Sequence, residues 1–237
     1  MFARGLDDRP VSVTFTRPAG HDTWTVATQL LPGRSPLQFT APNLQYLMDS
    51  PAEFGPGDLR TFVVDGHTFR VAAHHDGTVD DLNRFVSDVK AIVTEQRAIY
   101  GEYPAYEPGY YTFLADYLPY ANGDGMEHRN STVISAAASI RADRLRLLGT
   151  ASHEFFHNWN VERIRPRSLE PFNFEAANMS SELWLAEGFT QYYGPLTLSR
   201  TGLADLRGTA ATWAGLINRS EEHTSELQSR LHLVCRL

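Results

Sequence analysis

The sequence predicts an α+β fold, in which a β-rich N-terminal part precedes a part built from both helices and strands. Residues 9–75 hold short runs of alternating apolar and polar residues, which is the two-residue period of half-buried strands. From Val79 onward the apolar residues recur every three or four positions, which is the period of an amphipathic helix. This change of period places a domain boundary at Gly77. Residues 1–77 then form part of a β-sandwich-like domain, and residues 78–218 form a second domain.

The composition narrows the class of protein. The chain has 237 residues, of which 42% are apolar and 11% aromatic, enough for a substantial buried core. Its formal charge of −7 argues against a nucleic-acid partner. No apolar run approaches the roughly 18–20 residues that a membrane span requires. Residues 1–8 lack the apolar core of a signal peptide, and the compartment stays open between cytoplasm and periplasm. The single cysteine, Cys235, allows neither an internal disulfide nor a thiolate zinc site.

The N-terminal part predicts several strands and one irregular stretch. Val11 begins a run in which apolar residues alternate with serine and threonine, and a second strand is expected from Trp24 to Leu31. Residues 42–57 are rich in Pro, Asp, Asn and Gly, so an irregular connection is expected there. Asp65-Gly66 between two apolar runs predicts a hairpin with a type I′ turn. The pattern thus predicts a few strands that belong to a sheet whose other strands are missing.

The second part predicts three helices and two strands. The first helix has about 20 residues, is opened by Thr78 or Asp80 and closes near Gly101. On the next helix, Leu145 and Leu148 are expected to face the core, together with Ser152 and Phe156. The remaining predicted elements are strands at 110–118 and 131–135, a Gly-rich loop at 122–128 between them, and helices at 142–159 and 180–199.

The helix over residues 142–159 carries the motif His153-Glu-Phe-Phe-His157. Histidines four apart share one helix face about one turn apart, so both imidazoles can bind one metal ion, the H-E-x-x-H pattern of zinc hydrolases. Catalytic zinc takes three protein ligands, and Glu187 on the following helix is the candidate third ligand. The ion lowers the pKa of a water to about 7, and Glu154 would accept its proton and pass it to the leaving amine. A chance match, in which the histidines only cap or pack, is the alternative.

The runs at 153–166, 169–172 and 183–193 resemble the glycyl aminopeptidase family of gluzincin zinc metallopeptidases, related to aminopeptidase N and thermolysin. The resemblance extends over residues 1–218 and is strongest from Gly123 to Gly194. It implies a thermolysin-like catalytic domain that holds one Zn²⁺ ion and releases small N-terminal residues such as Gly or Ala. It also implies a PDZ domain after the catalytic domain in full-length members. By this resemblance the zinc ligands are His153, His157 and Glu187, and the general base is Glu154.

The stretch Gly123–His128 resembles the Gly-x-Met-Glu-Asn loop of the aminopeptidase N relatives, in which the glutamate binds the free α-amino group of the substrate. The resemblance implies this role for Glu127, with His128 in place of the asparagine. A carboxylate beside the zinc cleft would fix an ammonium group, so the implied substrate is a peptide with a free N-terminus. For Glu127, a solvated loop carboxylate is the alternative.

Other polar residues near the motif are weaker candidates. Asn158 or Gln191 would hydrogen-bond a zinc ligand, although core or helix-surface roles are equally compatible with the pattern. The arginines at 163, 165 and 167 would pair with carboxylates across the loop, or be solvated. His74 and His75 lack a carboxylate at ligand spacing in the sequence and are discounted.

Both ends of the chain resemble the ends of a fragment. Family members have a longer N-terminal β domain. After the glutamate helix they have a helical subdomain, whose tyrosine stabilises the transition state. Residues 219–229 have no apolar face and resemble a translated sequencing adapter, so an artefactual tail is expected over residues 219–237, with a polar tail as the alternative. Two alternatives to an aminopeptidase stay open. They are an endopeptidase of the same fold, in which Glu127 serves another purpose, and an inactive fragment used for binding.

Overall fold

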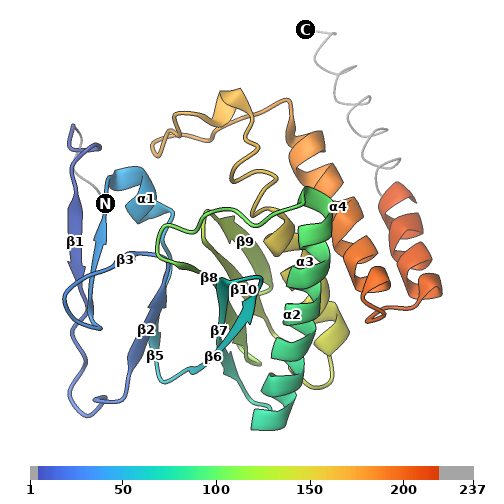
Figure 1. The fold of residues 1–237 in the computed structure, drawn as a ribbon, viewed down its shortest axis with the longest axis horizontal. Helices are drawn as coiled ribbons and strands as arrows, with labels where there is room; N and C mark the ends of the chain where they lie inside the picture. Colours follow the sequence, from blue (N-terminus) through green and yellow to red (C-terminus); the bar gives the residue numbers. More distant parts are fainter. Residues whose placement is uncertain (1–4, 219–237) are drawn as a thin grey trace, which may run out of the picture.

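The structure is a computed structural model that describes residues 5–218, so the expected artefactual tail at 219–237 lies outside the described residues. A five-stranded sheet stands at the centre, with small N-terminal strands on one side and the long helices on the other (Figure 1). The expected α+β class, with an N-terminal β domain and a following mixed domain, is confirmed. None of the helices over residues 5–218 combines the length and apolar character that a membrane span requires.

The N-terminal part consists of two small antiparallel sheets and one short helix. The strands β1 (Val11–Thr14), β4 (Gln38–Ala41) and β3 (Leu31–Pro32) form one sheet. The strands β2 (Thr25–Thr28) and β5 (Ala52–Gly55) form the other.

The expectation of an irregular connection at 42–57 is wrong, since this stretch contains the helix α1 (Leu44–Met48) as well as β5. The Asn43 side chain caps α1 by accepting a hydrogen bond from the backbone N–H of Tyr46, at 2.8 Å. β5 exists because it pairs with β2, a contact that the local sequence pattern does not show.

The central sheet has the strand order β6-β7-β8-β10-β9. Its inner pairs, β7 with β8 and β8 with β10, are parallel, and its two outer pairs are antiparallel. The strands are β6 (Asp58–Val64), β7 (His67–His75), β8 (Tyr110–Tyr117), β9 (Asp124–His128) and β10 (Ser131–Ala136). Strand pairing therefore joins residues 58–75 to strands that follow Gly77, where the domain boundary was expected.

Two features of this sheet bear on the sequence predictions. The type I′ turn is confirmed, because Asp65 and Gly66 have φ angles of 47° and 78°. The Gly-rich loop expected at 122–128 is wrong from Asp124 onward, where β9 forms the edge of the sheet by antiparallel pairing with β10. Asp and Gly are poor strand formers, so here the partner strand decides the conformation.

Four helices follow or cover the sheet. They are α2 (Val79–Tyr100), α3 (Arg144–Phe156), α4 (Leu183–Arg200) and a helix over residues 206–218, with one 3₁₀ turn, η1 (Arg167–Leu169). The predicted cap of α2 is confirmed, since Thr78 and Asp81 form a capping box and Gly101 closes the helix at φ 87°. On α3 the expectation for Leu145 is wrong. This side chain is exposed, and Leu147 is buried instead, whereas the expectation for Leu148, Ser152 and Phe156 is confirmed.

Aromatic packing holds α3 between the sheet and α4. The Phe155 ring lies on the sheet, 5.1 Å from the Tyr111 ring and 5.5 Å from the Phe113 ring. The Phe156 ring stacks on Tyr193 of α4 at 5.0 Å and 13°. Because two successive phenylalanines fix both flanks of α3, the remaining faces of the motif are held in one orientation.

Candidate metal centre

The two motif histidines and Glu187 meet where α3 packs along α4. The Nε2 atoms of His153 and His157 are 3.1 Å apart. One Glu187 oxygen lies 3.4 Å from His153 Nε2, and the other lies 3.6 Å from His157 Nε2. The three side chains therefore form a compact triangle of one carboxylate and two imidazoles, a group that can hold a metal ion.

The size of this triangle fits zinc. Donor atoms bound at about 2.0–2.2 Å to a tetrahedral zinc ion lie about 3.4 Å from one another. The three separations here, from 3.1 to 3.6 Å, bracket that value. Two imidazoles with one carboxylate are also the ligand set of several catalytic zinc sites, which keep a fourth position open.

Hydrogen bonds orient both imidazoles with Nε2 toward the centre. His157 Nδ1 lies 2.6 Å from the backbone carbonyl oxygen of Asn160. A carbonyl can only accept, so Nδ1 carries the proton. His153 Nδ1 donates in the same way to Gln191 Oε1 at 2.8 Å. The prediction that Gln191 hydrogen-bonds a motif histidine is thus confirmed, and both Nε2 atoms are available as ligands.

Asn158, the other candidate for this contact, points elsewhere, since its Nδ2 donates to the Tyr106 hydroxyl. Asn160 was missed by sequence reasoning. Its Nδ2 donates to the carbonyls of Leu185 and Ala186 at 3.1 and 2.9 Å. Asn160 therefore fastens the turn after the motif to the first turns of α4, which also carry Glu187. The sequence holds only a weak signal for this role, because a contact through a backbone carbonyl has no side-chain pattern.

Glu154 is only 5% exposed and lies between α3 and β9. Burial raises the pKa of its carboxyl group to about 7, although the adjacent His153 and His157 work in the opposite direction. The chain passes very close at this point. A Cβ built on Gly125 of β9 would lie 2.9 Å from Glu154 Cδ. A buried carboxyl group that titrates near neutral pH is suited to accept and return a proton.

The charges of the site are mutually dependent. The hydrogen bonds from His153 and His157 hold the pKa of Glu187 well below its usual range. Burial lowers the pKa of His157, but its contact with Glu187 and the negative charge of Glu127 outweigh this and raise it to about 9. The carboxylates around His157 therefore favour a positive charge at this point of the site.

Glu127 lies on β9 next to the zinc-ligand candidates. Donor atoms of Glu127, Glu154 and His157 all lie within 4.8 Å of one another. Glu127 also faces a cavity of about 880 Å³ between α1, β9 and the chain around η1. Its neighbour His128 is buried, and His128 Nδ1 contacts Asp49 Oδ1 at 2.9 Å.

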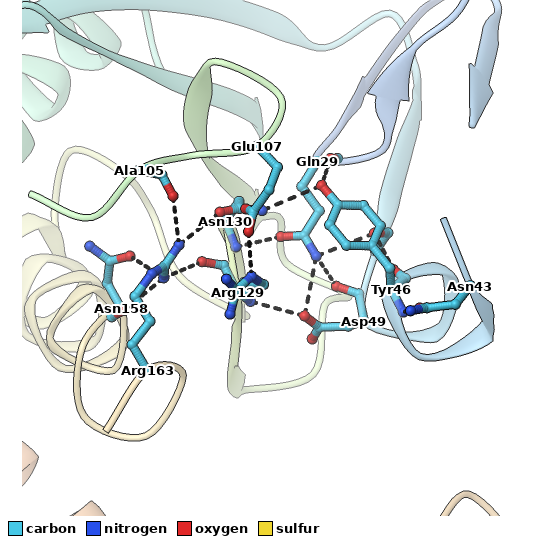
Figure 2. A network of polar contacts seen from close by, with 11 residues as sticks. Gln29, Asn43, Tyr46, Asp49, Ala105, Glu107, Arg129, Asn130, Asn158 and Arg163 are labelled. Carbon is cyan, nitrogen blue, oxygen red and sulfur yellow. Dashed lines mark hydrogen bonds and ion pairs between the residues drawn. The ribbon is translucent and has the colours of Figure 1, made fainter. Parts of the chain in front are cut away.

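A polar network supports the end of β9 (Figure 2). Gln29 Oε1 accepts from the backbone N–H of Asn130 at 2.6 Å, and Asp49 Oδ2 accepts from that of Arg129 at 3.1 Å. Arg163 donates to the carbonyls of Arg129 and Ala105 and to the side chain of Asn130. The turn between β9 and β10 is therefore held from both sides.

The expectation that the arginines pair with carboxylates is wrong for Arg163. Arg163 donates to backbone carbonyls and amide oxygens rather than pairing with carboxylates. Arg165 lies 3.7 Å from Glu170 and so pairs as expected.

The expectation that His74 lacks a nearby carboxylate is also wrong. Its Nδ1 lies 3.0 Å from Asp116 and 3.4 Å from Glu53, so it does have carboxylates at ligand spacing. Its Nε2 is buried and has no partner among the described residues. A metal-bound histidine usually donates its other N–H, so this group has the character of a polar contact between β5 and the sheet.

Comparisons with known proteins agree with the fold and relate parts of the chain to a peptidase family. The sequence profile of the M61 glycyl aminopeptidase family matches residues 146–233, and that of the peptidase M61 N-terminal domain matches residues 1–56. The first match extends into the segment that was expected to be an artefact. Comparison with curated proteins gives no significant match.

A crystal structure of an aminopeptidase N family protein from Idiomarina loihiensis is similar to this chain, with a TM-score of 0.78 and 26% sequence identity. The similarity covers 87% of this chain and 36% of that protein, so this chain spans little more than a third of its length. The two profile matches thus relate residues 1–56 and 146–233 to domains of the M61 peptidase family, and the fold is similar to that of an aminopeptidase N family protein.

Proposed function

We propose that the domain is a zinc-dependent aminopeptidase that binds one Zn²⁺ ion through His153, His157 and Glu187. The observation that carries this proposal is the close approach of the three side chains, with the two Nε2 atoms 3.1 Å apart and one Glu187 oxygen 3.4 or 3.6 Å from each of them. The family resemblance implies that the enzyme prefers to release small N-terminal residues, Gly or Ala.

Each remaining group has a distinct part in this mechanism. When bound, zinc acts as a Lewis acid and allows water to lose a proton near neutral pH. Glu154 accepts that proton and returns it to the leaving amine, and its pKa of about 7 suits both transfers. Gln191 and the Asn160 carbonyl hold the imidazoles in the tautomer with a free Nε2.

The position of Glu127 favours release of the first residue. An α-ammonium group lies only two bonds from the carbonyl carbon of its own residue. If Glu127 holds the ammonium, within 4.8 Å of the Glu154 and His157 donor atoms, the first peptide bond is the one presented to the site. An internal peptide bond has no ammonium group at this distance, so an endopeptidase would use Glu127 differently.

Two measurements test the proposal. Metal analysis of purified protein should give one zinc per chain, and a folded sample without stoichiometric zinc would refute the metal site. A peptide with N-terminal Gly or Ala should be cleaved, and the same peptide acetylated at its N-terminus should not. Equal cleavage of both would favour an endopeptidase. Zinc without any turnover would favour an inactive fragment.

Glu154→Gln tests the general base within the same assay. The amide keeps the size of the side chain but cannot accept a proton, so kcat should fall by about 10²–10⁴-fold with zinc content unchanged. Activity at the wild-type level in this variant would exclude Glu154 as the base.

A further inference from the structure

Glu162 is a buried carboxylate with no hydrogen-bond donor among residues 5–218. It lies in the turn after α3, is only 7% exposed, and lines the cavity of about 880 Å³ that Glu127 also faces. Over residues 5–218, no backbone or side-chain group donates a hydrogen bond to its carboxyl oxygens, and no cation lies within ion-pair distance. Buried carboxylates are normally paired, so an unpaired carboxylate that faces a cavity indicates a position where a ligand can bind.

The cations around the cavity are engaged with other groups. Arg129 pairs with Glu107 at 2.7 Å, and Arg163 donates to carbonyl and amide oxygens. Arg165 reaches Glu170. Arg165 also favours the charged form of Glu162, but burial and the nearby Asp49 carboxylate outweigh it and raise the pKa of Glu162. The carboxylates of Glu127 and Asp49 line the same cavity, so its wall attracts a cation.

The proposed function indicates which cation would arrive there. A peptide presented to the zinc site brings its α-ammonium group to Glu127, and an N-terminal lysine brings a second ammonium on a flexible stem. An alkylammonium group has no acceptor and three N–H donors that point in different directions, so the carboxylate of Glu127 alone cannot accept from all of them.

We propose that Glu162 is a substrate-binding residue that accepts a hydrogen bond from an alkylammonium group of the peptide. This inference rests on the proposed aminopeptidase function. The ammonium has two possible sources, the α-amine of any substrate or the side chain of an N-terminal lysine.

The test compares Glu162→Gln with wild type on three peptides that differ only in the first residue: glycine, norleucine and lysine. Norleucine has the lysine stem without its charge. If Glu162 binds the α-ammonium, kcat/KM should fall by about tenfold to a hundredfold on all three peptides. If it binds the side chain, only the lysine peptide should lose that much. Unchanged kcat/KM on all three would overturn the proposal.

Glu170→Gln is the matched control. Glu170 lines the same cavity but is half-exposed and pairs with Arg165, so this variant should leave all three peptides unaffected. Glu162→Asp keeps the charge and should recover part of the lost kcat/KM. If Glu162 served only to balance Arg165, Glu162→Gln would lower stability without changing substrate discrimination, which would also overturn the proposal.

A binding measurement separates this inference from the proposed function. Calorimetric titration with glycinamide and lysinamide needs no turnover. If the wild type cleaves nothing but binds either amide, with binding weakened at least tenfold in Glu162→Gln, the aminopeptidase proposal fails and the ammonium site stands. If the wild type cleaves peptides and Glu162→Gln binds both amides as tightly as the wild type does, the aminopeptidase proposal stands and the ammonium site at Glu162 fails.

Discussion

Glu154 lies against the backbone of Gly125, on the edge strand that also carries Glu127 two residues later. A methyl group at position 125 would stand 2.9 Å from Glu154 Cδ and 3.1 Å from Thr150 Cγ2. The absence of a side chain at this position therefore allows the strand and the proposed general base to approach each other.

Gly125→Val should displace the Glu154 carboxyl group and lower kcat by at least tenfold, while the three metal ligands stay in place. Steady-state kinetics combined with zinc analysis would check this. Gly123→Val is the control, because a Cβ there meets nothing within 4 Å. If both variants lose activity equally, the effect belongs to the strand and not to the contact with Glu154.

Gln191→Ala should weaken zinc binding by about 10–100-fold, because His153 loses the acceptor that orients its ring. Competition with a chromophoric chelator measures the affinity. Gln191→Glu retains an acceptor oxygen for His153, so its zinc affinity should stay close to that of the wild type. Unaltered affinity in the alanine variant would show that helix packing alone orients His153.

The raised pKa of Glu162 should make the stability of the protein depend on pH. Burial and the Asp49 carboxylate raise the pKa of its carboxyl group to about 7, against about 4.3 in an unfolded chain. The folded state thus binds the proton more tightly, so the stability from this group is complete below about pH 4.3 and is lost as the pH rises through about 7. Glu162→Gln does not titrate and should therefore gain stability relative to wild type across this range, by about 1–3 kcal/mol.

Urea unfolding at pH 5 and pH 8 measures that gain, with Glu170→Gln as the control. A Glu162→Gln variant that is less stable than wild type at pH 8 would contradict the expectation. A gain in stability together with a loss of substrate binding is the usual trade-off of a functional residue.

Gln29→Ala should destabilise the protein by about 1–3 kcal/mol, because it leaves the buried N–H of Asn130 without an acceptor. Gln29 is fully buried, whereas Gln38 in β4 is exposed, so Gln38→Ala serves as the control. Urea unfolding compares the two. Equal stability of both variants would mean that water replaces the lost acceptor.

The parts of the site that lie on one helix were predictable from the sequence. Residues four apart on a helix must share a face, which determines the relation of His153 to His157. The same periodicity predicted α2, and the N-cap preference for Thr or Asp predicted its start at Thr78 or Asp80, of which Thr78 is the cap. Glu187 lies on another helix, and its approach depends on how α4 packs against α3, which the family resemblance supplied.

The parts that depend on distant partners were missed. β9 was expected as a loop because Asp124, Gly125 and Glu127 have low strand propensity, and only β10 makes it a strand. Asn160 acts through backbone carbonyls, and Gln29 contacts a residue 101 positions later. Contacts of this kind leave no period in the sequence.

That separation of 101 residues has a consequence for how the molecule is assembled. Loop closure over such a distance costs chain entropy before any contact compensates for it, so the support of the β9–β10 turn should form late in folding. During synthesis, Gln29, Tyr46 and Asp49 leave the ribosome well before Asn130. The N-terminal residues of this network are thus available when the β9–β10 edge of the sheet forms.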